Sequence, residues 1–203
     1  MTTRTRKPAS VRKTEITRTA MDLAFEVGPD RVTTALIADR LGLTQPAIYK
    51  HFPSKDDIWD AVTDALCQRI DANIRAAADH PRPLDQLRAL VMGQLRLLHD
   101  HPALPEIMVM RDPTADTTAV RTRVTLCMGG LRAAIHRAMR EGQSVGEIRS
   151  DLDTEDSTNL LISVVQGLAL RLLRFRETEN FLSTGARLLD LQLRLLTTQG
   201  EIT

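Results

Sequence analysis

Apolar residues recur at helical spacing along almost the whole chain. Between residues 10 and 27, positions three or four residues apart are filled by Ile16, Ala20, Leu23, Ala24 and Val27, the pattern of a helix that buries one face. We find no run that alternates apolar and polar residues, as a half-buried strand would. The sequence therefore predicts an all-α protein of about nine helices.

Glycine, proline and capping residues mark where these helices begin and end. Gly42 suits a left-handed C-cap. Thr44 can cap the helix that follows, and Pro46 fits its first turn. Ser54-Lys55-Asp56-Asp57 has the form of a capping box. We predict helices over about 10–27, 34–41, 44–52, 54–78, 84–99, 104–110, 118–141, 154–175 and 179–197.

Charge separates the N-terminus from the rest of the chain. Residues 1–20 carry six basic residues against one acidic residue, a net charge of +5, whereas the remaining 21 basic and 25 acidic residues give −4. A basic arm favours a polyanionic partner, although a disordered solubilising tail explains it as well. We expect a flexible arm over 1–9, a small domain over 10–53 and a larger helical domain over 54–203.

Composition also bears on the compartment. There is no apolar run long enough to span a membrane, and no apolar segment follows the charged N-terminus as in a signal peptide. Cys67 and Cys127 form no CxxC motif, so we expect buried small hydrophobes in a reducing cytoplasm, with a redox switch as the lesser alternative. We therefore predict a cytoplasmic protein without a membrane partner.

The stretch LGLTQPAIYKHFPSKDDIW, residues 41–59, holds the chain's one Tyr and one Trp. A short helix, a glycine turn and a second short helix form a helix-turn-helix, whose second helix can enter the DNA major groove. A glutamine there can pair with adenine, and helix-start threonines and nearby basic groups can hold phosphates. The polar candidates are Thr33, Thr34, Thr44, Gln45, Tyr49, Lys50, His51 and Lys55, and Pro46 and Ala47 could contact a thymine methyl. Alternatively, Tyr49 is packed and Lys50 merely solvated.

Residues 33–59, TTALIADRLGLTQPAIYKHFPSKDDIW, resemble the DNA-binding domain of the TetR family of transcriptional repressors. The shared signature consists of Thr33, Ile37-Ala38, Gly42-Leu43-Thr44, Tyr49, His51-Phe52 and Ser54-Lys55. The resemblance extends over about Thr14 to Val62, and the remaining chain matches the family only in the number and order of helices.

This resemblance implies a role for each matched residue. Thr33 or Thr34 and Lys55 would bind phosphate, Tyr49 and His51 would touch the DNA backbone, and Gln45, Pro46, Ala47 and Lys50 would face base edges. Ala35 departs from members that place a long polar or basic side chain there, which weakens the case for base readout from the preceding helix.

The last two predicted helices each carry more than one apolar stripe, whereas a surface helix of a monomer needs only one. We therefore expect them to form a homodimer face, a four-helix bundle about a two-fold axis; the alternative is a pair buried within one subunit. The predicted interface residues are Leu161, Val165, Leu168, Leu172, Leu188, Leu191 and Leu195. The resemblance favours the dimer, because the family pairs through its last two helices.

The resemblance also implies regulation by a small-molecule effector inside the larger domain. Candidate pocket residues lie on the middle helices, where methionine suits an adaptable apolar pocket as readily as a plain core. They are Met92, Leu95, His99, Met108, Cys127, Leu131 and Gln166. His99 and His101 point two ways on a helix with no thiolate beside them, so we expect no metal.

Other classes of protein fit less well. We see no Ser/His/Asp arrangement, no HExxH motif and no paired carboxylates that would mark a catalytic site or cofactor. The sequence therefore predicts a homodimeric, ligand-responsive repressor that binds double-stranded palindromic DNA. An activator without small-molecule control, or a helical scaffold protein that binds partners through its C-terminal face, is the alternative.

Overall fold

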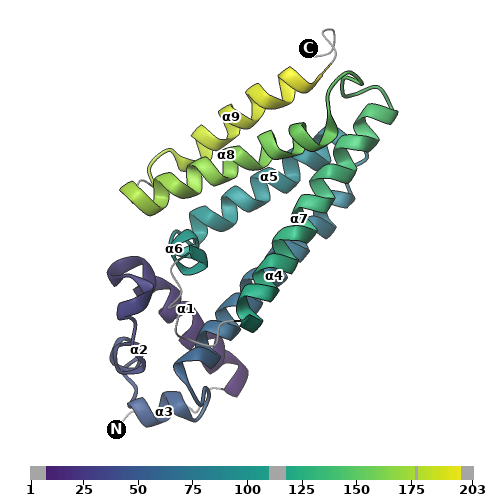
Figure 1. Cartoon of the computed structure of the whole chain (residues 1–203). Coiled ribbons are helices and arrows are strands. Elements are labelled where there is room, and N and C mark those ends of the chain that lie inside the picture. The colour runs from purple at the N-terminus through teal and green to yellow at the C-terminus, as the bar shows by residue number, and fades with distance from the viewer. Residues whose placement is uncertain (1–7, 110–117, 177, 198–203) are drawn as a thin grey trace.

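A computed structural model describes residues 8–109, 118–176 and 178–197, with the side chains of 107–109 and 118–121 outside the description. These residues form nine α-helices, one short 3-10 turn and no strand, so the predicted all-α class is confirmed (Figure 1). The helices are α1 (Ala9–Val27), α2 (Thr34–Leu41), α3 (Gln45–Tyr49), α4 (Lys55–Ala78), α5 (Pro83–Asp100), α6 (Leu104–Val109), α7 (Thr118–Ser144), α8 (Thr154–Phe175) and α9 (Phe181–Leu196), with the 3-10 turn at Pro29–Arg31.

Most of the predicted capping residues do what their chemistry favours. Gly42 adopts the left-handed conformation at φ 60° and ends α2, as its missing Cβ permits. Ser54 and Asp57 form the reciprocal capping box that begins α4. The prediction for Thr44 was wrong, because Thr44 occupies the N-cap position of α3 without a capping hydrogen bond from its side chain.

Helices α1, α2 and α3 form a small unit at one end of the molecule (Figure 1). Fully buried isoleucines from each helix, Ile16, Ile37 and Ile48, contribute to its core. The start of α4 adds Trp59 and Val62 to the same core, so α4 belongs to this unit as well as to the larger bundle. A displacement of α4 would therefore reach α1, against which it packs.

A bidentate ion pair ties α1 to α2. The two guanidinium nitrogens of Arg40 donate to the two carboxylate oxygens of Glu26 at 2.8 and 2.6 Å. This hydrogen bonding, with the positive charge of Arg40, lowers the pKa of the Glu26 carboxyl. The pair holds the scaffold on which the helix-turn-helix is built.

The larger bundle is assembled around α5, which packs against α4, α7, α8 and α9 (Figure 1). Its close approach to α4 depends on Gly93, since a Cβ there would lie 1.9 Å from Oδ1 of Asn73. The Asn73 side chain instead donates to the Leu90 carbonyl at 2.9 Å. Gly185 serves the same purpose between α9 and α5, where a Cβ would lie 2.6 Å from Leu95.

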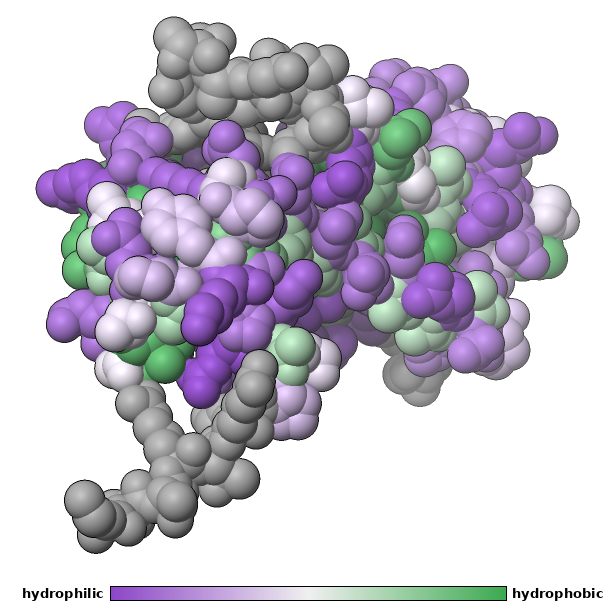
Figure 2. Space-filling model, turned by 90° about the horizontal axis from the view of Figure 1, so that it is seen from below, coloured by the Kyte–Doolittle hydropathy of each residue, from purple (hydrophilic) through white to green (hydrophobic). Residues whose placement is uncertain are grey.

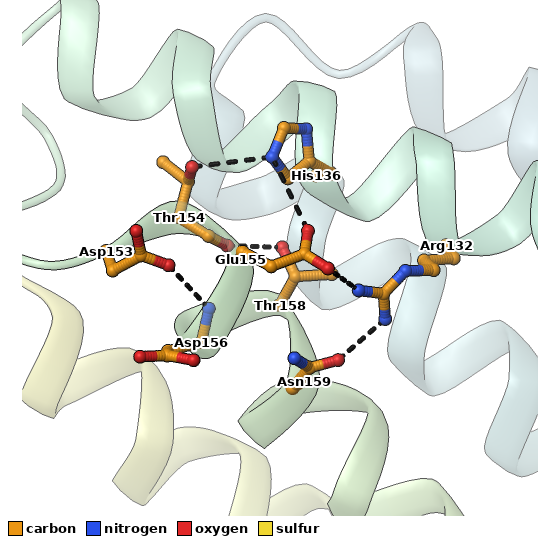
Figure 3. A network of polar contacts seen from close by, with 8 residues as sticks. All are labelled: Arg132, His136, Asp153, Thr154, Glu155, Asp156, Thr158 and Asn159. Carbon is orange, nitrogen blue, oxygen red and sulfur yellow. Dashed lines mark hydrogen bonds and ion pairs between the residues drawn. The ribbon is translucent and has the colours of Figure 1, made fainter.

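A polar network fixes the start of α8 on α7 (Figure 3). Arg132 of α7 pairs with Glu155 and donates to Asn159 at 2.7 Å. Asp153 caps α8 by accepting from the Asp156 amide at 2.8 Å, and His136 lies 3.4 Å from the Thr154 hydroxyl. These contacts set the rotation of α8, and hence which of its faces remains outside the subunit.

The outward faces of α8 and α9 carry large apolar side chains. Leu188, Leu191 and Leu195 of α9 are 40, 50 and 64% exposed, and Leu160 and Leu170 of α8 are 61 and 60% exposed. Gly167 on α8 has open space around the position of a Cβ. The structure therefore presents a large apolar surface on the two helices predicted to pair.

The predicted interface needs a correction on α8. Leu161, Leu168 and Leu172 are buried within the subunit and Val165 is half-buried, because α8 turns that stripe toward the core. Leu160, Gly167 and Leu170 occupy its outward side instead. The sequence showed two stripes on the helix but not which of them faces inward.

Among the described helices, α8 is long and apolar enough to cross a membrane by length and composition alone. The sequence had predicted no apolar run long enough for this. Its inner stripe packs in the bundle, and its outer side continues the apolar surface of α9, which is what a helix at a subunit interface requires.

The C-terminal end of α8 touches the small unit formed by α1, α2 and α3. Arg176 donates to the carbonyl of Phe25 on α1 and lies 5.3 Å over the Phe25 ring. It also pairs with Glu106 of α6 at 3.4 Å. The bundle is thus joined to α1 through Arg176 as well as through the continuous helix α4.

Candidate nucleic-acid interface

The second helix of the helix-turn-helix lies on the outside of the molecule. Ile48 is fully buried beneath it, whereas Gln45, Pro46, Tyr49 and Lys50 are exposed. Hydrophilic and near-neutral residues cover most of this end of the molecule, which Figure 2 views from below. Helix α3 therefore has the buried anchor and free outer face that insertion into a major groove requires.

Three polar side chains connect α3 to α2. The Gln45 side-chain nitrogen donates to the Thr34 hydroxyl at 2.8 Å, and that hydroxyl donates to the Tyr49 oxygen at 3.3 Å. An amide nitrogen carries two hydrogens, so Gln45 can keep this bond and still offer its second N–H and its Oε1 to a base. Thr34 thus orients the side chain best suited to read adenine.

The predicted phosphate-binding role of Thr34 needs a correction. Its side chain is 5% exposed and holds Gln45 and Tyr49, so it is turned away from solvent. Thr33 is exposed and its hydroxyl accepts from the Leu36 amide at 3.1 Å. Thr33, at the start of α2, is therefore the better placed of the two threonines for a phosphate.

The remaining predicted DNA contacts surround α3. Thr44 is exposed, and Ala47 and His51 are half-buried at its edges. Lys55, at the start of α4, is half-buried with its ammonium group 3.5 Å from the Asp30 carbonyl. Lys13 of α1 also lies near the end of α3, with its ammonium group 5.3 Å over the Phe52 ring.

Thr34→Val should weaken operator binding by a dimer about 30-fold while leaving the fold intact. Valine keeps the shape of the buried side chain but removes the hydroxyl that orients Gln45, an interaction worth about 1 kcal/mol in each of the two subunits. Fluorescence anisotropy with labelled duplex would measure the affinity, and thermal melting would check the fold. Thr34→Ser, which keeps the hydroxyl, is the matched control; equal loss in both variants would contradict a role for this hydrogen bond.

The predicted effector-pocket residues are divided between interior and surface. Leu95, Cys127 and Leu131 are buried and Met92 is half-buried. His99 is exposed with its ring stacked 6.3 Å from Phe181, and Gln166 is exposed on α8; these two predictions need correction, because neither side chain lies inside the bundle. The Met108 side chain lies outside the described residues.

The described residues bring together no group of three or more potential metal ligands.

Sequence reasoning missed Gln94, whose side chain is 3% exposed. It lies on the same face of α5 as the buried Leu87, Val91 and Leu98. Its Oε1 atom has no hydrogen-bond partner among the described residues, an unfavourable state for a buried polar atom. A polar residue inside an apolar helical stripe was the available signal.

Fold and interface together define a helix-turn-helix DNA-binding regulator. Residues 16–62 match the model of the bacterial regulatory proteins of the tetR family. The chain is 30% identical over 206 residues to the HTH-type transcriptional regulator TtgR of Pseudomonas putida, with 97% of this chain and 96% of TtgR covered. The protein belongs to the TetR family.

Two further relatives agree with this assignment. The class A tetracycline repressor from transposon 1721 of Escherichia coli is 38% identical over 85 residues, which cover 40% of this chain and 35% of the repressor. The structure of the ketosteroid transcriptional regulator KstR2 of Mycobacterium tuberculosis superposes with a TM-score of 0.78 and 19% identity, covering 93% of this chain and 96% of that chain. The second similarity shows the shared fold.

Proposed function

We propose that this protein is a homodimeric repressor, without enzymatic activity and acting in the cytoplasm, that releases a palindromic operator when a small molecule enters its helical bundle. The exposed helix α3 on its buried Ile48 anchor is the observation that carries DNA binding. The arm 1–9 would add salt-sensitive affinity for phosphates. We place domain boundaries after residues 9 and 53, which separate the basic arm, the DNA-binding domain and the larger helical domain.

The homodimer is supported by the apolar surface of α8 and α9. A monomer would expose Leu160, Leu170, Leu188, Leu191 and Leu195 together, and such a patch on a soluble protein marks an interaction site. Pairing α8 and α9 of two subunits about a two-fold axis would cover these leucines. It would also fix the distance between two α3 helices, as two operator half-sites require.

Effector control is supported by a buried polar atom in the bundle, Oε1 of Gln94, that has no hydrogen-bond partner among the described residues. The Oε1 of Gln94 can accept one hydrogen bond from a ligand that carries an N–H or O–H group. The buried Cys127 and Leu131 of α7 would contribute apolar contacts. A ligand bound there would release the operator only if it prefers the subunit arrangement that does not fit DNA.

Gln94→Leu should raise the free energy of unfolding by about 1 kcal/mol or more, because it removes a buried oxygen that has no hydrogen-bond partner among the described residues. The same change should abolish release by any effector that donates to Gln94. Chemical denaturation measures the first effect. Gln68→Leu, at an exposed glutamine of α4, is the control and should leave stability nearly unchanged. A destabilised Gln94→Leu protein would show that the carboxamide has a protein partner.

The proposed function is tested by selecting genomic fragments, including DNA flanking the protein's own gene, for binding to the purified protein. The expected result is a palindromic site bound by two subunits, with affinity that falls steeply with salt. Binding without sequence preference, or no binding, would favour the scaffold alternative. A reporter gene behind the selected site then distinguishes repression from activation.

A further inference from the structure

The two cysteines, 60 residues apart in sequence, meet between α4 and α7. The Cys67 sulfur on α4 lies 3.9 Å from the carbonyl oxygen of Arg123 on α7. In a regular helix the amide of Cys127 donates to that same carbonyl, four residues earlier. Cys67 therefore contacts α7 one helical turn from Cys127.

The neighbouring contacts place the two cysteines at the same level of the helix pair. Nε of Arg123 pairs with Asp64 of α4 at 3.0 Å, and farther along, a Cβ on Gly130 would lie 3.9 Å from Cδ1 of Ile74. Both contacts show that α4 and α7 run in the same direction. Cys67 lies three residues after Asp64, and Cys127 four after Arg123, so each cysteine shares a helix face with the ion pair.

The surroundings of the thiols limit which reactions they can undergo. Both cysteines are free and buried, and the Cys127 thiol donates to the Val124 carbonyl at 3.4 Å. The pKa of the Cys127 thiol is raised to about 12, mainly by burial and secondly by the adjacent Cys67. Cys127 is therefore protonated at neutral pH and is a poor first target for an oxidant.

We propose that Cys67 and Cys127 form a reversible intramolecular disulfide that couples peroxide exposure to release of the operator. Hydrogen peroxide converts the Cys67 thiol to a sulfenic acid and one water. The Cys127 sulfur then attacks the Cys67 sulfur while its proton passes to the departing hydroxyl, so that the S–S bond forms and a second water leaves. Two thiols thus lose two hydrogens and two electrons, and one peroxide is reduced to two waters.

The position of the bond gives it a consequence for DNA binding, which rests on the proposed function. A disulfide requires its sulfurs about 2.05 Å apart, closer than two thiols in contact, so we expect its formation to draw α4 and α7 together. Trp59 and Val62 are buried near the start of α4, and α4 packs against α1, which packs against α2, which in turn packs against α3. The shift would reach both recognition helices of a dimer and lower operator affinity about fivefold or more, the usual range of coupling between sites.

The test treats the full-length folded protein with hydrogen peroxide, blocks remaining thiols with an alkylating agent under denaturing conditions and measures its mass. We expect both thiols to be protected, a loss of about 2 Da from paired oxidation and a linked peptide pair containing Cys67 and Cys127. Dithiothreitol should restore both thiols. Two alkylated thiols after treatment, disulfides between subunits, or sulfinic acid on one cysteine would overturn the proposal.

Operator affinity is measured on the same samples. Oxidation should weaken binding by the wild type and leave Cys67→Ser and Cys127→Ser unchanged. A linked pair with unchanged affinity would overturn the coupling to DNA. Should the reduced protein bind no operator at all, the proposed function fails while the mass measurement still decides whether the disulfide forms. Because that measurement uses the wild type, it does not depend on the folding of either variant.

Discussion

Leu191→Arg should produce a folded monomer that binds the operator at least a hundredfold more weakly than the wild type. Leu191 is 50% exposed at the centre of the apolar stripe of α9, so an arginine there can be solvated in a single subunit. In the dimer the two-fold axis would bring two such charges into one apolar interface, where burial of an unpaired charge is strongly unfavourable.

The size of the effect follows from bivalency. When two subunits are joined, the second α3 meets its half-site at a high effective concentration, which raises affinity by about 10² to 10⁴ over one subunit. Sedimentation velocity would report the oligomeric state and anisotropy the operator affinity. Leu126→Arg is the matched control, because Leu126 is a 70% exposed leucine of α7. If the Leu191→Arg variant remained a dimer and bound the operator with normal affinity, pairing through α9 would be contradicted.

Lys50→Ala should weaken operator binding about 30-fold or more. One basic contact to DNA contributes about 1 kcal/mol or more, and a dimer loses it in both half-sites. Lys50 is exposed at the end of α3, so its truncation should not alter the melting temperature. The affinity is measured over a range of salt concentrations.

The salt dependence distinguishes the two roles open to Lys50. A phosphate contact predicts a salt slope that falls by about 2 per dimer, whereas a base contact predicts a smaller change in slope and relaxed preference at one position of each half-site. Arg75→Ala, an exposed cation on the far part of α4, is the control and should bind normally. Equal affinities for the wild type and Lys50→Ala would remove Lys50 from the interface.

Local chemistry made much of the fold predictable. Gly42 and the Ser54–Asp57 capping box determine helix ends through interactions within a few residues, so the sequence alone reveals them. The spacing of apolar residues likewise predicted which residues form α8. Which stripe of α8 faces inward depends on its contacts with α7, such as Arg132 with Asn159, and no pattern within α8 contains that information.

The DNA interface shows the same limit. The sequence pattern predicted that α3 exposes Gln45, Tyr49 and Lys50. It could not predict that Thr34 is buried and holds Gln45 and Tyr49, because these side chains lie 11 and 15 residues away in the chain. Two adjacent threonines at a helix start looked equivalent in the sequence. Similarly, the meeting of Cys67 and Cys127 depends on the register of two helices that are not consecutive in the chain.

The most direct test is to attach a DNA-cleaving iron chelate to residue 45 through Gln45→Cys, in a chain that also carries Cys67→Ser and Cys127→Ser. On the selected operator, we predict cleavage in two major-groove segments centred about 34–36 Å apart or a multiple of that distance, one for each subunit. The same chelate at Val145→Cys, an exposed site at the end of α7, should leave the operator uncut. A single cleaved segment, or cleavage only from residue 145, would contradict recognition by a pair of α3 helices.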